Sequence, residues 1–144
     1  MPDMPPRLNH VALSLPSEAL QPDGRSEIVD FYGDVFGWTE YPQLTEDGRR
    51  LVLGLATYDQ FVFLVGDDDP LRAPRTDHFG LSVHTEAEFD ELLDRVKARM
   101  ADDHRIHLDD HTVDDQEVVK IHSFYVHHLL PLTVEVQWWE WPER

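Results

Sequence analysis

Hydrophobic and polar residues alternate along two short stretches, residues 9–15 and 77–84, and this alternation predicts a β-strand in each. In the second stretch the apolar residues share one face, while His78 shares the other face with small residues. Small neighbours leave room beside the imidazole, which suits the wall of a cavity. The first stretch repeats this pattern around His10, 68 positions earlier (78 minus 10). Such a spacing, near half the chain, indicates an internal repeat.

Each of these strands is followed by the same succession of elements. Apolar residues recur at helical spacing over residues 28–36 and 89–100, which predicts two amphipathic helices. Gly37 is placed to end the first helix, and Thr85 with Glu88 forms a capping box before the second. The other expected segments are a loop at 16–24, strands at 8–15, 38–41, 50–56, 61–65, 105–108, 118–127 and 132–139, and an acidic turn region at 109–115.

The order β-α-β-β-β therefore occurs twice. A small sheet with one helix is not expected to bury its apolar surface alone, so the two halves are predicted to join. The sequence predicts an α+β fold with two βαβββ modules, residues 8–66 and 77–141, which form a shared curved mixed sheet around one cavity. Residues 67–76 are the expected linker, and residues 1–144 form a single domain.

Charge and composition narrow the possible partners. The formal net charge of −17 argues against binding nucleic acid or anionic membranes, which both need a basic surface. No apolar run approaches the ~20 residues of a membrane span, and the proline-rich N-terminus lacks the apolar core of a signal peptide. The chain has no cysteine, which is compatible with a reducing compartment. We expect a soluble, cytoplasmic protein that acts on a small molecule.

Glu135 is a carboxylate in an otherwise apolar predicted strand, with no lysine or arginine beside it. A buried, unpaired carboxylate is costly, so this group should be exposed, protonated, hydrogen-bonded or bound to a metal. Together with His10 and His78 it makes a set of two imidazoles and one carboxylate. Such a set suits a divalent ion and leaves coordination positions for water or substrate.

The sequence resembles the vicinal oxygen chelate superfamily over nearly its whole length. The resemblance is carried by residues 9–13, 31–38, 77–83, 124–126 and 134–136. The superfamily includes glyoxalase I, fosfomycin-thiol transferases, extradiol dioxygenases, methylmalonyl-CoA epimerase and metal-free bleomycin-binding proteins. The resemblance implies the paired-module fold, and it is specific for the fold rather than for one reaction.

The resemblance also implies a ligand set. His10 and His78 match the ligand positions of the first strands, and Glu135 matches the ligand on the last strand of the second module. Residues 61–65 offer no fourth ligand, in contrast to glyoxalase I and the epimerase. The remaining set resembles those of extradiol dioxygenases and fosfomycin-thiol transferases. By the same resemblance Tyr125 is expected to donate a hydrogen bond near the metal, and a core tyrosine is the alternative.

Two functions stay open at this point. One is a metal-dependent enzyme of the lyase or dioxygenase type, in which iron, manganese, nickel or zinc chelates a substrate through vicinal oxygens; Glu135 and Tyr125 are its expected catalytic residues. The other is a metal-free protein that sequesters an aromatic or planar ligand, as the bleomycin-binding relatives do. A homodimer is expected in either case, because Trp138, Trp139 and Trp141 place much apolar surface near the C-terminus.

Overall fold

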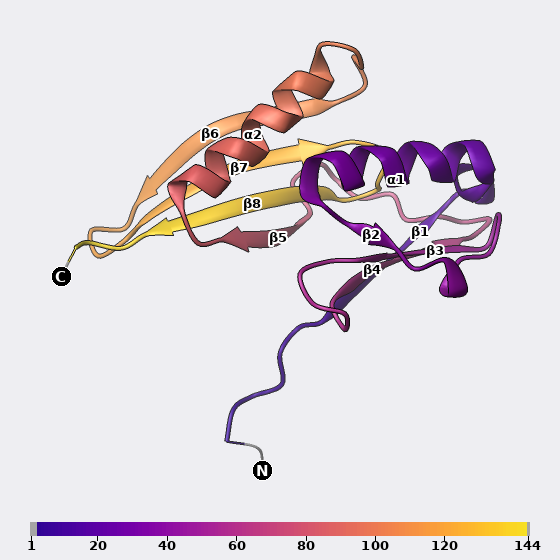
Figure 1. Cartoon of the computed structure of the whole chain (residues 1–144), viewed down its shortest axis with the longest axis horizontal. Coiled ribbons are helices and arrows are strands. Elements are labelled where there is room, and N and C mark those ends of the chain that lie inside the picture. The colour runs from indigo at the N-terminus through magenta and orange to yellow at the C-terminus, as the bar shows by residue number, and fades with distance from the viewer. Residues whose placement is uncertain (1–2, 144) are drawn as a thin grey trace. The chain divides into compact units, whose positions relative to one another are not determined.

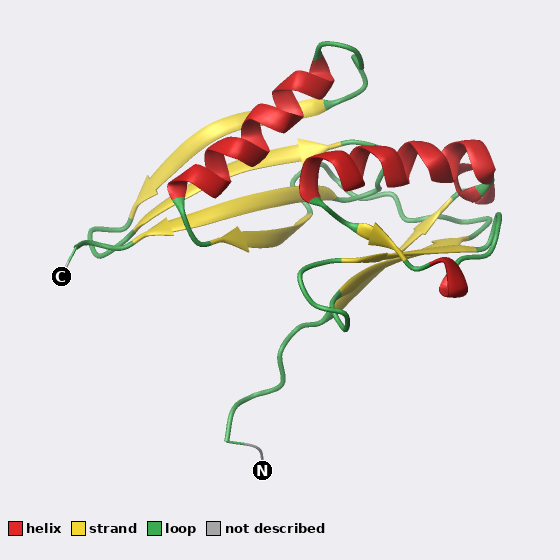
Figure 2. Ribbon diagram, in the orientation of Figure 1, coloured by secondary structure: helices red, strands yellow, loops and turns green. Residues whose placement is uncertain are grey.

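Figure 1 presents the computed structural model, which describes residues 3–143. Contacts divide the chain into two compact units, and the boundary between Leu71 and Arg72 falls inside the predicted linker. Each unit contains one four-stranded mixed sheet and one long helix (Figure 2). In the described residues, neither long helix combines the length and apolar character that crossing a membrane requires.

The first unit contains β1 (His10–Leu15), η1 (Ser17–Leu20), α1 (Pro22–Phe36), β2 (Thr39–Glu40), η2 (Pro42–Leu44), β3 (Arg50–Gly54) and β4 (Phe61–Gly66). Its strand order is β1-β4-β3-β2, with β1 and β4 parallel and the other pairs antiparallel. Helix α1 ends, as predicted, at Gly37, whose left-handed φ of 73° suits glycine. The helix buries Ile28, Phe31, Tyr32 and Val35.

The second unit contains β5 (His78–Val83), α2 (Glu86–Met100), β6 (His107–Asp115), β7 (Lys120–His127) and β8 (Thr133–Glu140). Its order, β5-β8-β7-β6, repeats that of the first unit, with β5 and β8 parallel. The predicted capping box is confirmed, because the Thr85 side chain accepts a hydrogen bond from the Glu88 backbone and the Glu88 carboxylate accepts one from the Thr85 backbone. Helix α2 buries Phe89, Leu93 and Val96.

The α+β class and the two βαβββ modules are confirmed. In place of the single shared sheet that the sequence predicts, the hydrogen bonds between the described strands form two sheets, one in each unit. The physical reason lies in the helices. In the second unit Phe89 of α2 packs on Phe124 of β7, and in the first Tyr32 of α1 stacks on Trp38, the residue before β2. Each helix thus packs on residues of its own module.

Two predicted segments are wrong. Residues 16–24 are expected to be a loop, but they form η1 and the first turn of α1, which Pro22 begins because proline suits the first helical position. Residues 109–115 are expected to be an acidic turn, but they belong to β6. β6 is an edge strand, and its register on β7 is interrupted between Asp109 and Thr112. An edge strand tolerates exposed charges and bulges that an interior strand would not.

Tyr32 is expected to make the stability of the first unit fall at alkaline pH. Its side chain is fully buried and stacks on Trp38, with ring centroids 4.7 Å apart. Burial raises the pKa of Tyr32 far above its ordinary value, so the stability that its neutral form contributes is present below about pH 10 and is lost as the pH rises further. We expect this group alone to lower the free energy of unfolding by about 1.4 kcal/mol per pH unit above about pH 10.

Urea unfolding of the wild type and Tyr32→Phe at several alkaline pH values measures this slope. The variant should show a shallower decline, and loss of the hydroxyl would add only an offset that is constant with pH. Tyr58→Phe is the control, because Tyr58 is 89% exposed. Equal slopes in the wild type and Tyr32→Phe would contradict the prediction.

Candidate metal centre

Four polar side chains gather on the sheet face of the second unit that points away from α2. Phe124 of β7 packs against that helix, so Tyr125, the next residue, faces the opposite side. Glu135 of β8 lies opposite Tyr125 on one side and opposite Gly80 of β5 on the other. His78 and Gln137 complete the group from the same two strands, β5 and β8. The strand register thus places residues from distant parts of the sequence in one small area.

Glu135 is 5% exposed, and its carboxylate is held by neutral donors. The Gln137 Nε2 donates to Glu135 Oε2 at 3.1 Å. The pKa of Tyr125 is raised, chiefly by the hydrogen bond of its hydroxyl to Glu135, so the phenol stays protonated and keeps donating. Among residues 3–143 the ion-pair partner of Glu135 is His78, which is no permanent cation. Of the states that the sequence left open for Glu135, the structure shows a buried, hydrogen-bonded carboxylate.

The orientation of His78 is set by the backbone. Its Nδ1 lies 2.8 Å from the carbonyl oxygen of Thr76, which can only accept, so Nδ1 carries the proton. In the neutral ring the lone pair is then on Nε2, and Nε2 lies 3.4 Å from Glu135 Oε1. A lone pair that faces a carboxylate oxygen is unfavourable unless a hydrogen-bond donor or a cation lies between the two atoms. Two ligands about 2.1 Å from one ion are about 3.0–3.4 Å apart, so the observed separation fits the metal.

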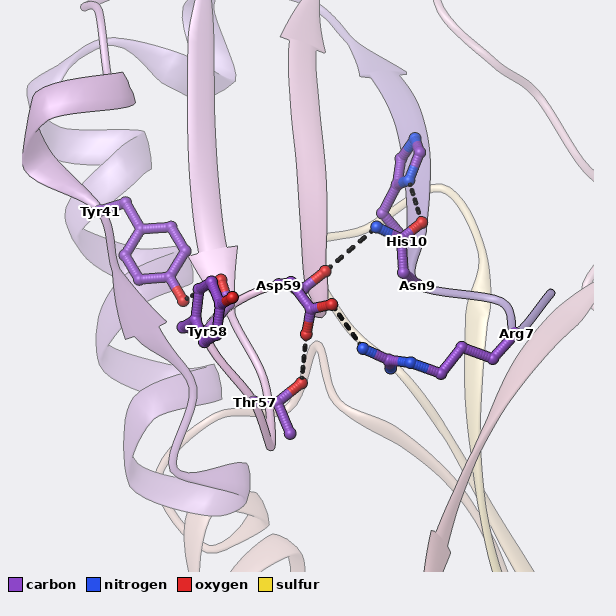
Figure 3. Close-up of polar contacts among 7 residues, drawn as sticks. All are labelled: Arg7, Asn9, His10, Tyr41, Thr57, Tyr58 and Asp59. Atoms are coloured by element: carbon purple, nitrogen blue, oxygen red, sulfur yellow. Dashed lines mark hydrogen bonds and ion pairs between the residues drawn. The ribbon is translucent and has the colours of Figure 1, made fainter. Parts of the chain in front are cut away.

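His10 is oriented in a similar way within the first unit (Figure 3). Its Nδ1 lies 2.8 Å from Asn9 Oδ1, and the Asn9 Nδ2 donates to the carbonyl oxygen of Asp59 at 3.1 Å. That second hydrogen bond fixes which way the amide points, so Nδ1 of His10 is the donor and Nε2 keeps its lone pair. The ring stacks on Phe61 with centroids 4.7 Å apart. His10 thus presents a free, preoriented Nε2.

Asp59 anchors this arrangement from the turn between β3 and β4. Its carboxylate binds the Thr57 hydroxyl and the Arg7 guanidinium, as Figure 3 shows. These contacts lower the pKa of Asp59, with the Thr57 hydrogen bond as the largest cause. The carboxylate stays ionised and holds the turn, and the backbone carbonyl of the same residue reaches Asn9. The turn at Asp59 therefore helps to orient the His10 ring through Asn9.

The structure brings together two of the three predicted ligands, His78 and Glu135, and places Tyr125 beside them, with the His78 and Tyr125 rings edge to face at 5.4 Å. Among the residues that the structure describes, no three histidine, cysteine, aspartate or glutamate side chains lie close enough together to hold a metal ion. His10 belongs to the other unit, and its convergence with the pair stays a prediction.

Sequence reasoning missed two residues that orient the ligands. Gln137 holds Glu135, and it could have been found from the alternation of β8, which places it on the same face two residues later. Asn9 holds His10, and it precedes that histidine directly. A side-chain acceptor on the second ring nitrogen is the usual way in which proteins orient a metal-binding histidine.

The sequence matches no family model and no curated protein. Solved structures do match. Lactoylglutathione lyase from Agrobacterium tumefaciens is 21% identical, with a TM-score of 0.64 over 93% of this chain and 94% of that one. A glyoxalase/bleomycin resistance protein/dioxygenase from Alicyclobacillus acidocaldarius is 19% identical, with a TM-score of 0.61 over 95% and 94%.

A third similar structure is the genomically encoded fosfomycin resistance protein from Listeria monocytogenes, which is 15% identical, with a TM-score of 0.62 over 98% of this chain and 97% of that one. Coverage is nearly complete in all three cases, while the identities are low, so the likeness is one of fold. It agrees with the two βαβββ modules and with the resemblance found in the sequence. The chain therefore has the fold of the vicinal oxygen chelate superfamily.

Proposed function

We propose that this protein is a divalent-metal-dependent enzyme of the glyoxalase or dioxygenase-like type. His10, His78 and Glu135 would hold the ion, which is iron, manganese, nickel or zinc, and the substrate would be a small molecule with vicinal oxygens. The observation that supports this most strongly is the pair formed by His78 and Glu135. The Nε2 lone pair faces a buried carboxylate oxygen at 3.4 Å, an arrangement that a divalent cation bound to both atoms would stabilise.

The chemistry of the donor set supports the same proposal. Two neutral imidazoles and one carboxylate would leave a divalent ion with a net charge of +1. That charge favours an anionic substrate that binds through two oxygens, since such a ligand supplies both charge and donors. Both histidines already have Nδ1 engaged by an oxygen acceptor, so each is limited to Nε2 as its ligand atom.

When bound, the ion would act as a Lewis acid that polarises a substrate oxygen. The protein's own residues would orient the reactants around it. Gln137 holds one oxygen of Glu135, which leaves Oε1 directed at His78. The Tyr125 hydroxyl remains protonated because its pKa is raised, so it can donate a hydrogen bond to Glu135 or to a substrate oxygen. Gly80 contributes no side chain beside Glu135 and leaves space for the substrate.

The test is metal analysis of protein purified without a chelating tag, followed by calorimetric titration of Fe²⁺, Mn²⁺, Ni²⁺ and Zn²⁺ into metal-stripped protein. We expect one tightly bound ion for each chain. Absence of metal from the native protein, together with failure of all four ions to bind, would rule the proposal out.

One observation favours the second function, a metal-free protein that sequesters a planar ligand. Trp139 and Trp141 are 44% and 61% exposed, so aromatic surface is available to a ligand whether or not metal is present. This function requires tight ligand binding by metal-stripped protein and little effect of Glu135→Ala on that affinity. The same titrations therefore distinguish it from the metal enzyme.

We also propose that the protein is a cytoplasmic homodimer. The lack of cysteine is compatible with that compartment. Exposed apolar side chains of the second unit, such as Val113 and Val118, supply surface for a dimer contact. Trp138 does not, because it stacks on His122 with centroids 4.4 Å apart.

Light scattering at micromolar concentration should give about 34 kDa, twice the 16.8 kDa of one chain. The expected physical cause is burial of the exposed apolar surface between two copies. A mass of one chain across the concentration range would refute the dimer.

A further inference from the structure

We propose that the second unit carries a binding site for a planar aromatic group without negative charge, beyond Glu135 on the same face of the sheet. The site is formed by Ser82 and His84 at the end of β5 and by Trp139 and Trp141 at the end of β8. The inference rests on the proposed function in one respect, since it assigns this aromatic group to the far end of the substrate whose oxygens reach the metal.

The site is a pocket of about 260 Å³, lined by Ser82, Val83, His84, Trp139 and Trp141. Sites for whole drug-sized ligands usually measure about 300–1,000 Å³. The pocket is therefore large enough for a one- or two-ring group and too small for a complete extended ligand. This size fits one end of a molecule whose other end lies elsewhere on the face.

The two tryptophans give the pocket its chemical character. Trp139 and Trp141 are 44% and 61% exposed, and their rings lie 5.8 Å apart at 42°. Trp38, by contrast, is 6% exposed and belongs to the core of the first unit. A tilted pair of exposed indoles offers both a ring face and a ring edge, the two surfaces on which another aromatic group packs.

A chain of hydrogen bonds connects the pocket to the proposed metal centre. The Trp139 Nε1 donates to Gln137 Oε1 at 2.9 Å, and the Gln137 Nε2 donates to Glu135 Oε2 at 3.1 Å. Because one amide makes both bonds, its orientation is fixed and so is that of the Trp139 ring. Glu135 and Trp139 are four residues apart on one face of β8, a separation of about 13 Å along the strand.

Between these two points the neighbouring strand presents only small residues. Gly80 pairs with Glu135, and Ser82 pairs with Gln137. A Cβ added at Gly80 would lie 3.6 Å from Glu135 Oε1, which is ordinary contact, so glycine leaves the space of one small side chain beside that oxygen. An elongated substrate could therefore lie along this path, with its oxygens at Glu135 and its ring at Trp139.

The charge of the chain indicates that the ring carries no negative charge. The net charge of −17 disfavours an anionic group. The residues that line the pocket also include no lysine or arginine to pair with an anion.

The test uses metal-stripped full-length protein and two probes, uncharged 2-naphthol and anionic 2-naphthalenesulfonate. Binding is followed through the indole N–H signals in NMR spectra and by calorimetry. We expect 2-naphthol to shift the signals of Trp139 and Trp141 but not that of Trp38, and the sulfonate to bind more weakly. Trp139→Ala and Trp141→Ala should each lower the 2-naphthol affinity by ~3–10-fold, the usual value of an aromatic pair.

Tyr58→Ala is the matched control, because Tyr58 is an exposed aromatic residue of the first unit and should leave affinity unchanged. The retained Trp38 and Trp138 signals report whether each variant is folded. The proposal is overturned if the Trp139 and Trp141 signals do not move, if the two variants bind 2-naphthol like the wild type, or if they lose affinity only because a dimer dissociates.

Metal binding and aromatic binding can be tested separately, because 2-naphthol binding is measured without metal. Trp141→Ala should keep the metal affinity of the wild type, since Trp141 lies outside the chain of hydrogen bonds that holds Glu135. Loss of metal binding with intact 2-naphthol binding would end the metal-enzyme proposal alone. Intact metal binding with no response to 2-naphthol would end the aromatic site alone.

Discussion

Replacing Glu135 with alanine is expected to lower the affinity for a divalent ion by at least ~10–100-fold, because losses of that size follow even from residues that only orient a ligand. Glu135 supplies the negative charge of the proposed site, and its Oε1 lies 3.4 Å from His78 Nε2. Calorimetric titration of Fe²⁺, Mn²⁺, Ni²⁺ and Zn²⁺ into metal-stripped wild type and variant measures the change. Glu135→Gln adds a test in which the side-chain shape is kept and the charge is removed.

Glu140→Ala is the matched control for this experiment. It removes a carboxylate from the same strand, but one that is paired with His122 rather than with the proposed site. The variant should bind metal like the wild type. Equal affinities in the wild type and Glu135→Ala would exclude Glu135 as a ligand. The metal-enzyme proposal would then fail with it.

Phe89→Ala is expected to lower the free energy of unfolding by about 3–5 kcal/mol, the usual cost of removing a buried aromatic ring. Phe89 is fully buried on α2 and packs edge to face on Phe124, with centroids 5.1 Å apart. Its loss leaves a cavity between α2 and the sheet that carries Glu135. Urea unfolding followed by circular dichroism measures the difference.

Glu91→Ala is the control on the same helix. Glu91 is exposed and forms a surface ion pair with Arg95, so its removal should cost no more than about 0.5 kcal/mol. A cost below about 1 kcal/mol for Phe89→Ala would contradict the role of this ring as the contact that holds α2 on its sheet.

Much of the fold follows from patterns that are local in the sequence. The alternation around His10 and His78 predicts β1 and β5, and the helical spacing of apolar residues predicts α1 and α2. These patterns are informative because side-chain direction within one strand or helix depends only on its own period. The same alternation correctly places Glu135 and Gln137 on one face of β8.

Residues 109–115 show where local patterns fail. Four of these seven residues are aspartates, a composition typical of turns, yet the segment pairs with β7 as an edge strand. Hydrogen bonds to a partner strand outweigh the weak local preference, because strand propensity depends on context. The partner strand, β7, also contains Tyr125. Nothing in the sequence of the acidic segment indicates that β7 is its partner.

The sequence by itself determined the repeat, the two modules and the face on which each candidate ligand lies, because these depend on spacing within single elements. Only the tertiary structure decided how Glu135 is buried, that Gly80 and Tyr125 flank it, and that the Thr76 carbonyl directs the His78 lone pair toward it. These features depend on register between strands that are far apart in the chain, and register is set by the packing of whole modules rather than by any one stretch of residues.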